Sequence, residues 1–320
     1  MIICVSANPA IDRRLRVSSL KVGEVIRASS AVSFAGGKAA HVAMAAKALG
    51  EEQVVWIGFL GGATGDEVER QLIGLGIEVV PIRTRSATRV NDEIIDDDGV
   101  ITEILEPGGK IVEAELIEFK SVCERLFSSP GPNFHAVFSG SLPPGVPSDL
   151  YADLIAMASK HGGRTMLDTS GDPLLLALSA RPDMIKPNRE EAEKAIGITI
   201  NGRETAALAT RRFADLGVNE TIISLGAEGL VPSVANDEIV SAMPPKVRVN
   251  STVGCGDATV AGLVVADIRG YELAEKLRFA VACGAANCLA DLPGQIKLAD
   301  VERLTPLVEI SRGMTGTSTM

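Results

Sequence analysis

The sequence predicts an α/β fold, in which a mostly parallel central sheet is flanked by helices. Short apolar runs alternate with segments whose apolar residues recur every three or four positions, as in amphipathic helices. Strands that alternate with helices form βαβ crossovers, which cover both faces of a parallel sheet with helices. The chain has 320 residues, of which 46% are hydrophobic, so it can form one large domain or two smaller ones.

The expected strands and helices follow one another along most of the chain. The strand-like runs are IICVSA at 2–7, VVWIGF at 54–59, AVFSGS at 136–141, RTMLDTS at 164–170, DMIKPN at 183–188 and TIISLG at 221–226. The helical segments between them are 42–50, 65–76, 149–162 and 205–217, and each closes on a glycine, a common residue at helix ends. From Gly256 onward we expect helices only, followed by a frayed tail at 313–320.

Two segments, 10–35 and 85–107, interrupt this alternation. Both contain alternating stretches without a helix, and the second carries the turn signal Asp97-Asp98-Gly99 between two strand-like arms. We expect a small β-sheet inserted in the main domain, which then comprises 1–9, 36–84 and 108–312. Such a sheet over the carboxyl edge of a parallel sheet would act as a lid on a ligand crevice. Its exposed edges would favour a homodimer.

Composition excludes several classes of protein. A net charge of −10 and only 3% aromatic residues argue against a nucleic-acid-binding protein. The five cysteines form no CxxC pair, which fits reduced thiols and a cytoplasmic location, and the three histidines have no zinc-site spacing. The N-terminal run lacks a basic region, so we do not expect a signal peptide, and no segment approaches the ~20 apolar residues that span a membrane. A small phosphorylated substrate remains compatible, because it needs only a few local Arg or Lys side chains.

The stretch NSTVGCGDATVAG at 250–262 places Gly254, Cys255, Gly256 and Asp257 at the start of an apolar run. One interpretation is that Asp257 caps a helix after a flexible turn. The other is a nest of backbone N–H groups that receives an anion, with Asp257 beside it as a base. For an isolated match, capping is the commoner case.

Similar turns follow other strand-like runs on the amino-terminal side of the chain. Asp12 lies in NPAID after the first run, Gly36 and Gly37 precede an Ala-rich helix, and Ser139 opens SGSLPPGVP. Asp12 could accept hydrogen bonds from substrate hydroxyls, and the two glycines would let a ligand approach the backbone. Taken singly, each is equally compatible with an ordinary turn.

Two more turns lie further along. Asn188 and Glu191, in KPNREE, could hold a hydrated Mg²⁺, or they could form a helix capping box. SLGAEG at 224–229 is another strand that runs into a Gly-rich turn. Because carboxyl ends of parallel strands meet at one edge of a sheet, so many such turns indicate a single site there.

These motifs together resemble those of the ribokinase-like, PfkB-type carbohydrate kinase family. AGGK, SGSLPPG, KPNxxE, SLGxxG and TVGxGDATVAG occur in the family's order, and the resemblance covers about residues 1–300. It is greatest for the branch of 1-phosphofructokinase, tagatose-6-phosphate kinase and the minor 6-phosphofructokinase. The resemblance implies an ATP-dependent, Mg²⁺-requiring kinase with a β-sheet lid that often pairs in a dimer. The acceptor would be a hydroxymethyl group of fructose 1-phosphate, fructose 6-phosphate or tagatose 6-phosphate.

The resemblance also implies a role for each motif. Asp257 would be the general base, and Gly254, Cys255 and Gly256 the anion hole for the transferred phosphoryl group. Asn188 and Glu191 would organise Mg²⁺. The residues implied on the nucleotide side are Lys186, Asn188, Ser224, Gly226, Gly229 and Asn287. Those implied on the sugar side are Asp12, Arg27, Gly36, Gly37, Lys38, His41, Arg89 and Ser139, with Arg27 and Arg89 as partners of a substrate phosphate.

The chain departs from the family pattern after GGK. Ala39, Ala40 and His41 stand where the family usually has Gly-x-Asn, and Cys255 replaces the more usual Ala. Asn both donates and accepts toward a hydroxyl, whereas His does so only in the right tautomer, so the identity of the sugar stays open. A kinase for an unphosphorylated sugar or a nucleoside is the alternative, and a non-catalytic sensor on the same fold is a second one. The basic residues Arg27, Lys38 and Arg89 favour a phosphorylated substrate.

Overall fold

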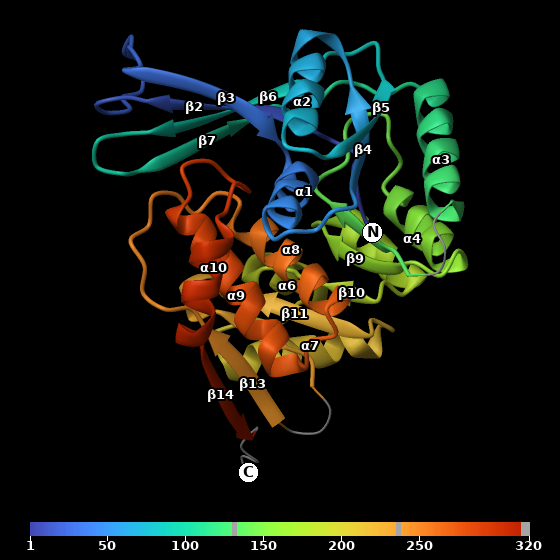
Figure 1. Cartoon of the computed structure of the whole chain (residues 1–320), viewed down its shortest axis with the longest axis vertical. Coiled ribbons are helices and arrows are strands. Elements are labelled where there is room, and N and C mark those ends of the chain that lie inside the picture. The colour runs from blue at the N-terminus through green and yellow to red at the C-terminus, as the bar shows by residue number, and fades with distance from the viewer. Residues whose placement is uncertain (130–132, 235–237, 315–320) are drawn as a thin grey trace.

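The computed structural model describes residues 1–129, 133–234 and 238–314. Within them the strands form a ten-stranded sheet and a separate four-stranded sheet, so the predicted α/β fold with a second, small sheet is confirmed (Figure 1). The strands are β1 Ile2–Ser6, β2 Ala10–Arg16, β3 Ser30–Gly36, β4 Val54–Leu60, β5 Glu78–Arg83, β6 Arg89–Ile95, β7 Ile101–Leu105, β8 His135–Ser139, β9 Arg164–Asp168, β10 Met184–Ile185, β11 Glu220–Ser224, β12 Leu230–Pro232, β13 Glu238–Met243 and β14 Glu309–Met314.

The large sheet has the order β14-β13-β12-β11-β10-β9-β8-β1-β4-β5. Every pair from β11 to β5 is parallel, whereas β12, β13 and β14 extend the sheet in antiparallel fashion. All residues of β1 and β4 are buried, as expected of strands that are covered on both faces. The parallel strands therefore end at one common edge, where the polar turns predicted from the sequence meet.

Helices cover the two faces of the large sheet in separate layers. They are α1 Lys38–Ala48, α2 Gly62–Gly74, α3 Glu113–Ser128, α4 Leu150–Lys160, α5 Asp172–Ala177, α6 Arg189–Ile196, α7 Arg203–Asp215, α8 Cys255–Ile268, α9 Leu273–Leu289 and α10 Leu298–Leu304. Buried residues of α1, α2, α8, α9 and α10 belong to one hydrophobic cluster, and those of α3 to α7 belong to the other. In α8, ten consecutive residues from Asp257 to Ala266 are buried, so this helix lies in the interior of its layer.

The small sheet has the order β3-β2-β6-β7 and projects away from the large sheet (Figure 1). β2 pairs with β3 in antiparallel and with β6 in parallel register, and β6 and β7 form the predicted hairpin. In its turn, an Asp96 carboxylate oxygen accepts hydrogen bonds from the backbone N–H groups of Asp98 and Val100. The acidic tip is therefore a hydrogen-bonded turn, as expected of an Asx residue there.

The expectation of helices only after Gly256 is wrong. β14 pairs with β13 along its whole length, from Glu309 opposite Met243 to Met314 opposite Glu238. This pairing joins segments more than sixty residues apart, and EISRGM alone has no strong strand pattern. Gly313 and Met314 of the predicted tail belong to this strand, and residues 315–320 lie outside the described residues. None of the helices in the described parts of the chain has the length and apolar character that a membrane crossing requires.

Candidate active site

Asp257 occupies the third position of α8 and is buried. The N-cap of this helix is Gly254, whose φ of 80° is the left-handed conformation that favours glycine, and no side chain caps the helix. The capping interpretation of Asp257 is therefore wrong: its carboxylate faces His41, with 2.9 Å between Asp257 Oδ2 and His41 Nδ1. A carboxylate at this buried helix start is available for chemistry.

The first turn of α8 presents backbone N–H groups beside this carboxylate. The N–H groups of Gly256 and Asp257 have no intrahelical acceptor because they lie in the first turn, and the helix dipole makes this end positive. The Cys255 N–H donates to the carbonyl oxygen of Thr252 at 3.2 Å. Of the three predicted anion-hole residues, Cys255 thus has an acceptor for its amide within the chain, whereas the Gly256 amide lies in the first turn, where a helix supplies no acceptor.

His41, in the first turns of α1, bridges two carboxylates. Its Nδ1 lies 2.9 Å from Asp257 Oδ2 and its Nε2 lies 3.3 Å from Asp12 Oδ2. Burial alone would lower the pKa of His41, but close contact with the two carboxylates and their negative charge outweigh it and raise that pKa to about 10. The imidazole is therefore charged at neutral pH, and it contacts both Asp12, which we predicted on the sugar side, and Asp257, the predicted base.

Asp12 lies on β2, where the small sheet adjoins the large one. Its Oδ1 accepts a hydrogen bond of 2.8 Å from the Asn91 side chain on β6. Burial tends to raise the pKa of Asp12, but His41, Asn91 and Arg89 together lower it below the ordinary value. A Cβ at Gly36 would lie 2.1 Å from the Asp12 carboxyl carbon, so only glycine at that position leaves space for this carboxylate.

The remaining residues predicted on the sugar side differ in burial and in their partners. Arg89 is half-buried, and its guanidinium donates hydrogen bonds to the carbonyl oxygens of Glu106 at 2.8 Å and Asn8 at 3.1 Å. Burial lowers the pKa of Arg89, although the negative charges of Asp12 and Glu106 oppose this shift. Ser139 is buried at the end of β8, and within the described residues its hydroxyl has no hydrogen-bond partner. Arg27 is exposed, in the loop between β2 and β3.

Asp168, at the end of β9, is a residue that sequence reasoning missed. It is 1% exposed, and its carboxylate lies 3.3 Å from Lys38 Nζ and 3.3 Å from Lys186 Nζ. Burial tends to raise the pKa of Asp168, but the two ammonium groups outweigh burial and lower this pKa. Burial tends to lower the pKa of Lys38, but the carboxylates of Asp168 and Glu191 outweigh burial and raise this pKa. Its position at a strand end, in LDTS, was the signal available in the sequence. Asp168 holds two cations at the carboxyl edge of the sheet.

Asn188 and Glu191 form the capping box of α6. The Glu191 N–H donates to Asn188 Oδ1 and the Asn188 N–H donates to Glu191 Oε2, both at 2.9 Å. Glu191 Oε1 is outside the box and lies 3.6 Å from Lys38 Nζ. The cap and a role at the site are therefore compatible, because each side chain keeps one polar atom that the cap does not use.

The other residues predicted on the nucleotide side lie at the end of β11, in the turn after it and on α9. Ser224, at the end of β11, donates its N–H to the Pro187 carbonyl, and Gly226 and Gly229 shape the turn that follows. Asn287 on α9 is buried; its side-chain NH₂ donates to the Val253 carbonyl at 2.8 Å and its oxygen accepts from the Gly294 N–H. Asn287 thus holds the turn before α8, a positioning contact that the sequence motif did not reveal.

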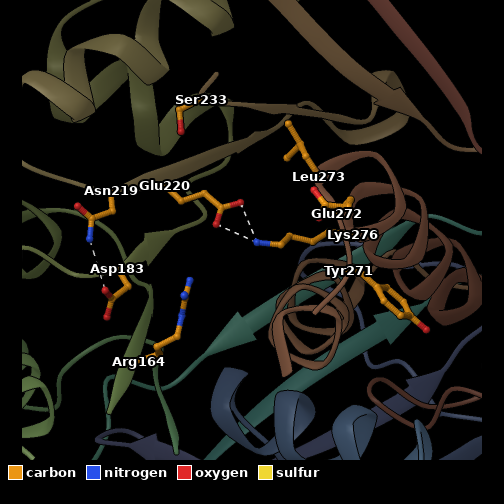
Figure 2. Close-up of a pocket in the computed structure, with 9 residues that line it drawn as sticks. All are labelled: Arg164, Asp183, Asn219, Glu220, Ser233, Tyr271, Glu272, Leu273 and Lys276. Atoms are coloured by element: carbon orange, nitrogen blue, oxygen red, sulfur yellow. Dashed lines mark hydrogen bonds and ion pairs between the residues drawn. The ribbon is translucent and has the colours of Figure 1, made fainter. Parts of the chain in front are cut away.

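A polar cavity of about 430 Å³ lies at the opposite edge of the large sheet, where β9 and β11 begin (Figure 2). Both cations that line it are paired with carboxylates: Lys276 with Glu220 at 3.0 Å and with Asp267 at 3.2 Å, and Arg164 with Asp267 at 2.8 Å. Because both of these cations are already paired and carboxylates outnumber them, this cavity is a poor site for a phosphate group.

A buried carboxylate beside free amides at a helix N-terminus, with two lysines nearby, is the arrangement of a phosphotransferase that acts on a hydroxyl group. Comparison with known proteins agrees with this class. Residues 1–295 match the model of the pfkB family carbohydrate kinases, and the chain belongs to this family. The large sheet with its small companion is the ribokinase-like architecture.

Individual relatives are similar over nearly the whole chain. The chain is 38% identical to a 1-phosphofructokinase of Rhodobacter capsulatus, over 88% of each sequence. It is 33% identical to a tagatose-6-phosphate kinase of Staphylococcus epidermidis, over 97% of this chain and 99% of the relative. Among solved structures, phosphofructokinase-2 of Escherichia coli in complex with fructose-6-phosphate is 26% identical with a TM-score of 0.86, covering 96% of this chain and 98% of that one.

Proposed function

We propose that this protein transfers the γ-phosphoryl group of ATP to a hydroxymethyl group of a phosphorylated ketohexose. Fructose 1-phosphate, fructose 6-phosphate and tagatose 6-phosphate are the candidate acceptors. Support comes from the relatives, which include a 1-phosphofructokinase, a tagatose-6-phosphate kinase and a phosphofructokinase-2 solved with fructose-6-phosphate. Fructose 1-phosphate is the first choice, because several relatives named 1-phosphofructokinase cover about 90% of the chain or more.

The observation that carries the proposal is the contact line Asp12–His41–Asp257 at the start of α8. Asp12 can accept a hydrogen bond from a sugar hydroxyl, while Asp257 takes the proton of the attacking hydroxyl as general base. The amides of the first turn then receive the transferred phosphoryl group, whose charge is spread over its oxygens. His41 keeps the two carboxylates in fixed positions relative to each other, because its ring contacts both.

The phosphate already on the substrate needs a cation on the sugar side. The charge of Arg89 lowers the pKa of Asp12, which indicates that the two side chains lie near each other. The buried Nε of Arg89 has no hydrogen-bond partner among the described residues, so the guanidinium can bind an anion. Arg89→Ala should therefore raise KM for the sugar phosphate by a factor that corresponds to about 2–5 kcal/mol, and leave KM for ATP nearly unchanged. Arg27→Ala tests the second predicted partner in the same way. Arg70→Ala, on the surface of α2, is the control.

ATP is expected with Mg²⁺, and the residues at the start of α6 fit a hydrated ion. Glu191 Oε1 is not used by the capping box, and Asn188 Oδ1, which accepts one hydrogen bond in it, has a second lone pair. Mg²⁺ usually keeps several waters and shares one or two carboxylates with substrate phosphates, so Glu191 can hold it through an oxygen or through water. When bound, the ion would neutralise charge on the triphosphate. The described residues contain no cluster of three or more His, Cys, Asp or Glu side chains that could hold a metal ion.

The small sheet is the proposed lid, comprising 10–35 and 85–107, and the proposed surface of a homodimer. Its strands supply Asp12 and Asn91 to the site, so a movement of the sheet would open or close the crevice. It also exposes large apolar side chains, which are Val22, Val25, Val32, Val100, Ile104 and Leu105. Exposed apolar residues on a sheet with free edges favour pairing with a second copy. Sedimentation of the purified protein would show a dimer, and a monomer at micromolar concentration would contradict it.

The test of function is ADP release by the purified protein with ATP and Mg²⁺ against a panel of acceptors. The panel contains fructose 1-phosphate, fructose 6-phosphate, tagatose 6-phosphate, fructose, ribose and adenosine. We expect turnover with one or more ketohexose phosphates and at least a hundredfold lower kcat/KM with the unphosphorylated acceptors. Equal activity on fructose and its phosphates would favour the sugar-kinase alternative. Absence of turnover with every acceptor would favour the sensor.

A further inference from the structure

Two of the five cysteines face each other beside the start of α8. Cys255 is the first residue of α8 and Cys288 lies in the last turn of α9, and their Sγ atoms are 3.2 Å apart. Both residues are partly exposed, whereas Cys4, Cys123 and Cys283 are fully buried. A small oxidant can therefore reach this pair and not the other three thiols.

The backbone on both sides holds this contact in place. The Cys288 carbonyl accepts a 2.8 Å hydrogen bond from the Asn250 N–H, in the segment that leads into α8. The Cys255 carbonyl accepts a 2.8 Å hydrogen bond from Thr259 Oγ1 and lies 3.3 Å from the position that a Cβ would have at Gly284. Because glycine at 284 lets α8 and α9 approach so closely, the two sulfur atoms are brought together by packing.

The two thiols differ in acidity. The hydrogen bond from the Cys255 thiol is the main cause that lowers the pKa of Cys288 to about 7, although burial opposes it. The same pairing and burial raise the pKa of Cys255 above its ordinary value. Cys288 is thus the nucleophilic sulfur near neutral pH, since the thiolate is the reactive form, and Cys255 is the partner that resolves it.

We propose that Cys255 and Cys288 form a reversible disulfide when the protein meets a hydroperoxide, and that this disulfide switches off phosphoryl transfer. The Cys288 thiolate attacks the peroxide oxygen, becomes a sulfenic acid and releases water or an alcohol. The Cys255 thiol then attacks that sulfur, the S–O bond breaks and a second water leaves. Two thiols lose two electrons and two protons in total, and one peroxide is reduced. A dithiol restores both thiols by exchange.

Disulfide formation would disturb the site because the sulfur atoms must move closer. An S–S bond is about 2.05 Å long, so the pair has to close by more than 1 Å from its 3.2 Å separation. The Cys288 backbone is tied to Asn250, so we expect the movement to fall on the turn from Thr252 to Gly256, which ends one residue before Asp257. A misplacement of about 1 Å at a reacting group can reduce turnover by about a hundredfold. This part of the inference rests on the proposed function.

The first experiment measures the chemistry without any activity assay. The reduced protein is treated with hydrogen peroxide, its thiols are counted after denaturation, and its peptides are mapped by mass spectrometry without reduction. We expect the thiol count to fall from five to three and one cross-linked peptide pair, 255 with 288, that lacks two hydrogen atoms. Addition of oxygen to Cys255 or Cys288 without a cross-link would overturn the proposal, even if the protein proves to be another kind of enzyme.

The second experiment follows activity in the same samples. The wild-type rate should fall about a hundredfold on oxidation and return with dithiothreitol. Cys288→Ser and Cys288→Ala should keep the basal rate and resist peroxide, since Cys288 lies outside the catalytic groups. Cys123→Ala, a buried control, should stay as sensitive as the wild type. A Cys288 variant inactivated as fast as the wild type, or a cross-linked protein at full activity, would refute the switch.

Discussion

His41 makes the stability of the protein depend on pH in a way that can be measured. Its imidazole is fully buried between Asp12 and Asp257, which raise its pKa from the ordinary 6.5 to about 10. Below pH 6.5 the folded and unfolded chains both hold this proton, so the stabilisation is fully present. Between 6.5 and about 10 only the folded chain holds it, and the free energy of unfolding falls as the pH rises.

The expected slope follows from the single proton. One proton held only by the folded state costs about 1.4 kcal/mol per pH unit, so from pH 7 to pH 9 the loss is about 3 kcal/mol. In His41→Asn the titrating group is absent, and this component of the slope should vanish. Other groups that titrate in this range are the same in both proteins, so the difference between the two slopes isolates His41.

The assay is urea unfolding at several pH values, followed by the fluorescence of Trp56. This is the single tryptophan of the chain and it is fully buried, so its emission reports loss of the core. His161→Asn serves as the control, because His161 pairs with Glu124 near the surface, where such a pair contributes little. Parallel profiles for wild type and His41→Asn would refute the reasoning, since the buried imidazole would then be neutral.

Three further results are expected. Asp257→Asn should lower kcat by ~10²–10⁴-fold, because it removes the proton acceptor. The affinity for ATP should stay nearly unchanged, since the size of the side chain is kept. A wild-type kcat in steady-state assays would exclude general-base catalysis. Glu93→Gln should lower the free energy of unfolding in urea by about 3–5 kcal/mol, because it breaks the buried 2.8 Å ion pair with Arg14. Asp92→Asn, at the adjacent and more exposed pair with Arg13, should lower it by under ~1 kcal/mol. Equal losses in the two variants would contradict this. His41→Asn should change the ranking of ketohexose phosphates in the ADP-release assay, and an unchanged ranking would confine His41 to holding the carboxylates.

The sequence predicted the alternation of strands and helices because each element carries its own pattern. β1 and β4 are continuous apolar runs, and the helices between the strands show the expected spacing of apolar residues. It failed at β14, where the strand exists only because β13 offers a free edge. Pairing between distant segments leaves little trace in a short sequence, so periodicity could not find it.

The same division holds for the site. The motifs identified Asp257, Gly254 and Asp12 because a glycine at a turn, or a carboxylate at a strand end, can be recognised from the neighbouring residues in the sequence. They did not identify Asp168, whose importance lies in its contacts with Lys38 and Lys186.

The sequence by itself determined the fold class, the family and the edge of the sheet at which polar residues gather. Only the tertiary structure decided that Asp257 is no helix cap, that His41 lies between two carboxylates, and that Cys255 meets Cys288. Local patterns record what each segment does with its own neighbours. The pKa of a buried group, or contact between two sulfur atoms, depends on which distant side chains the fold brings within a few ångströms.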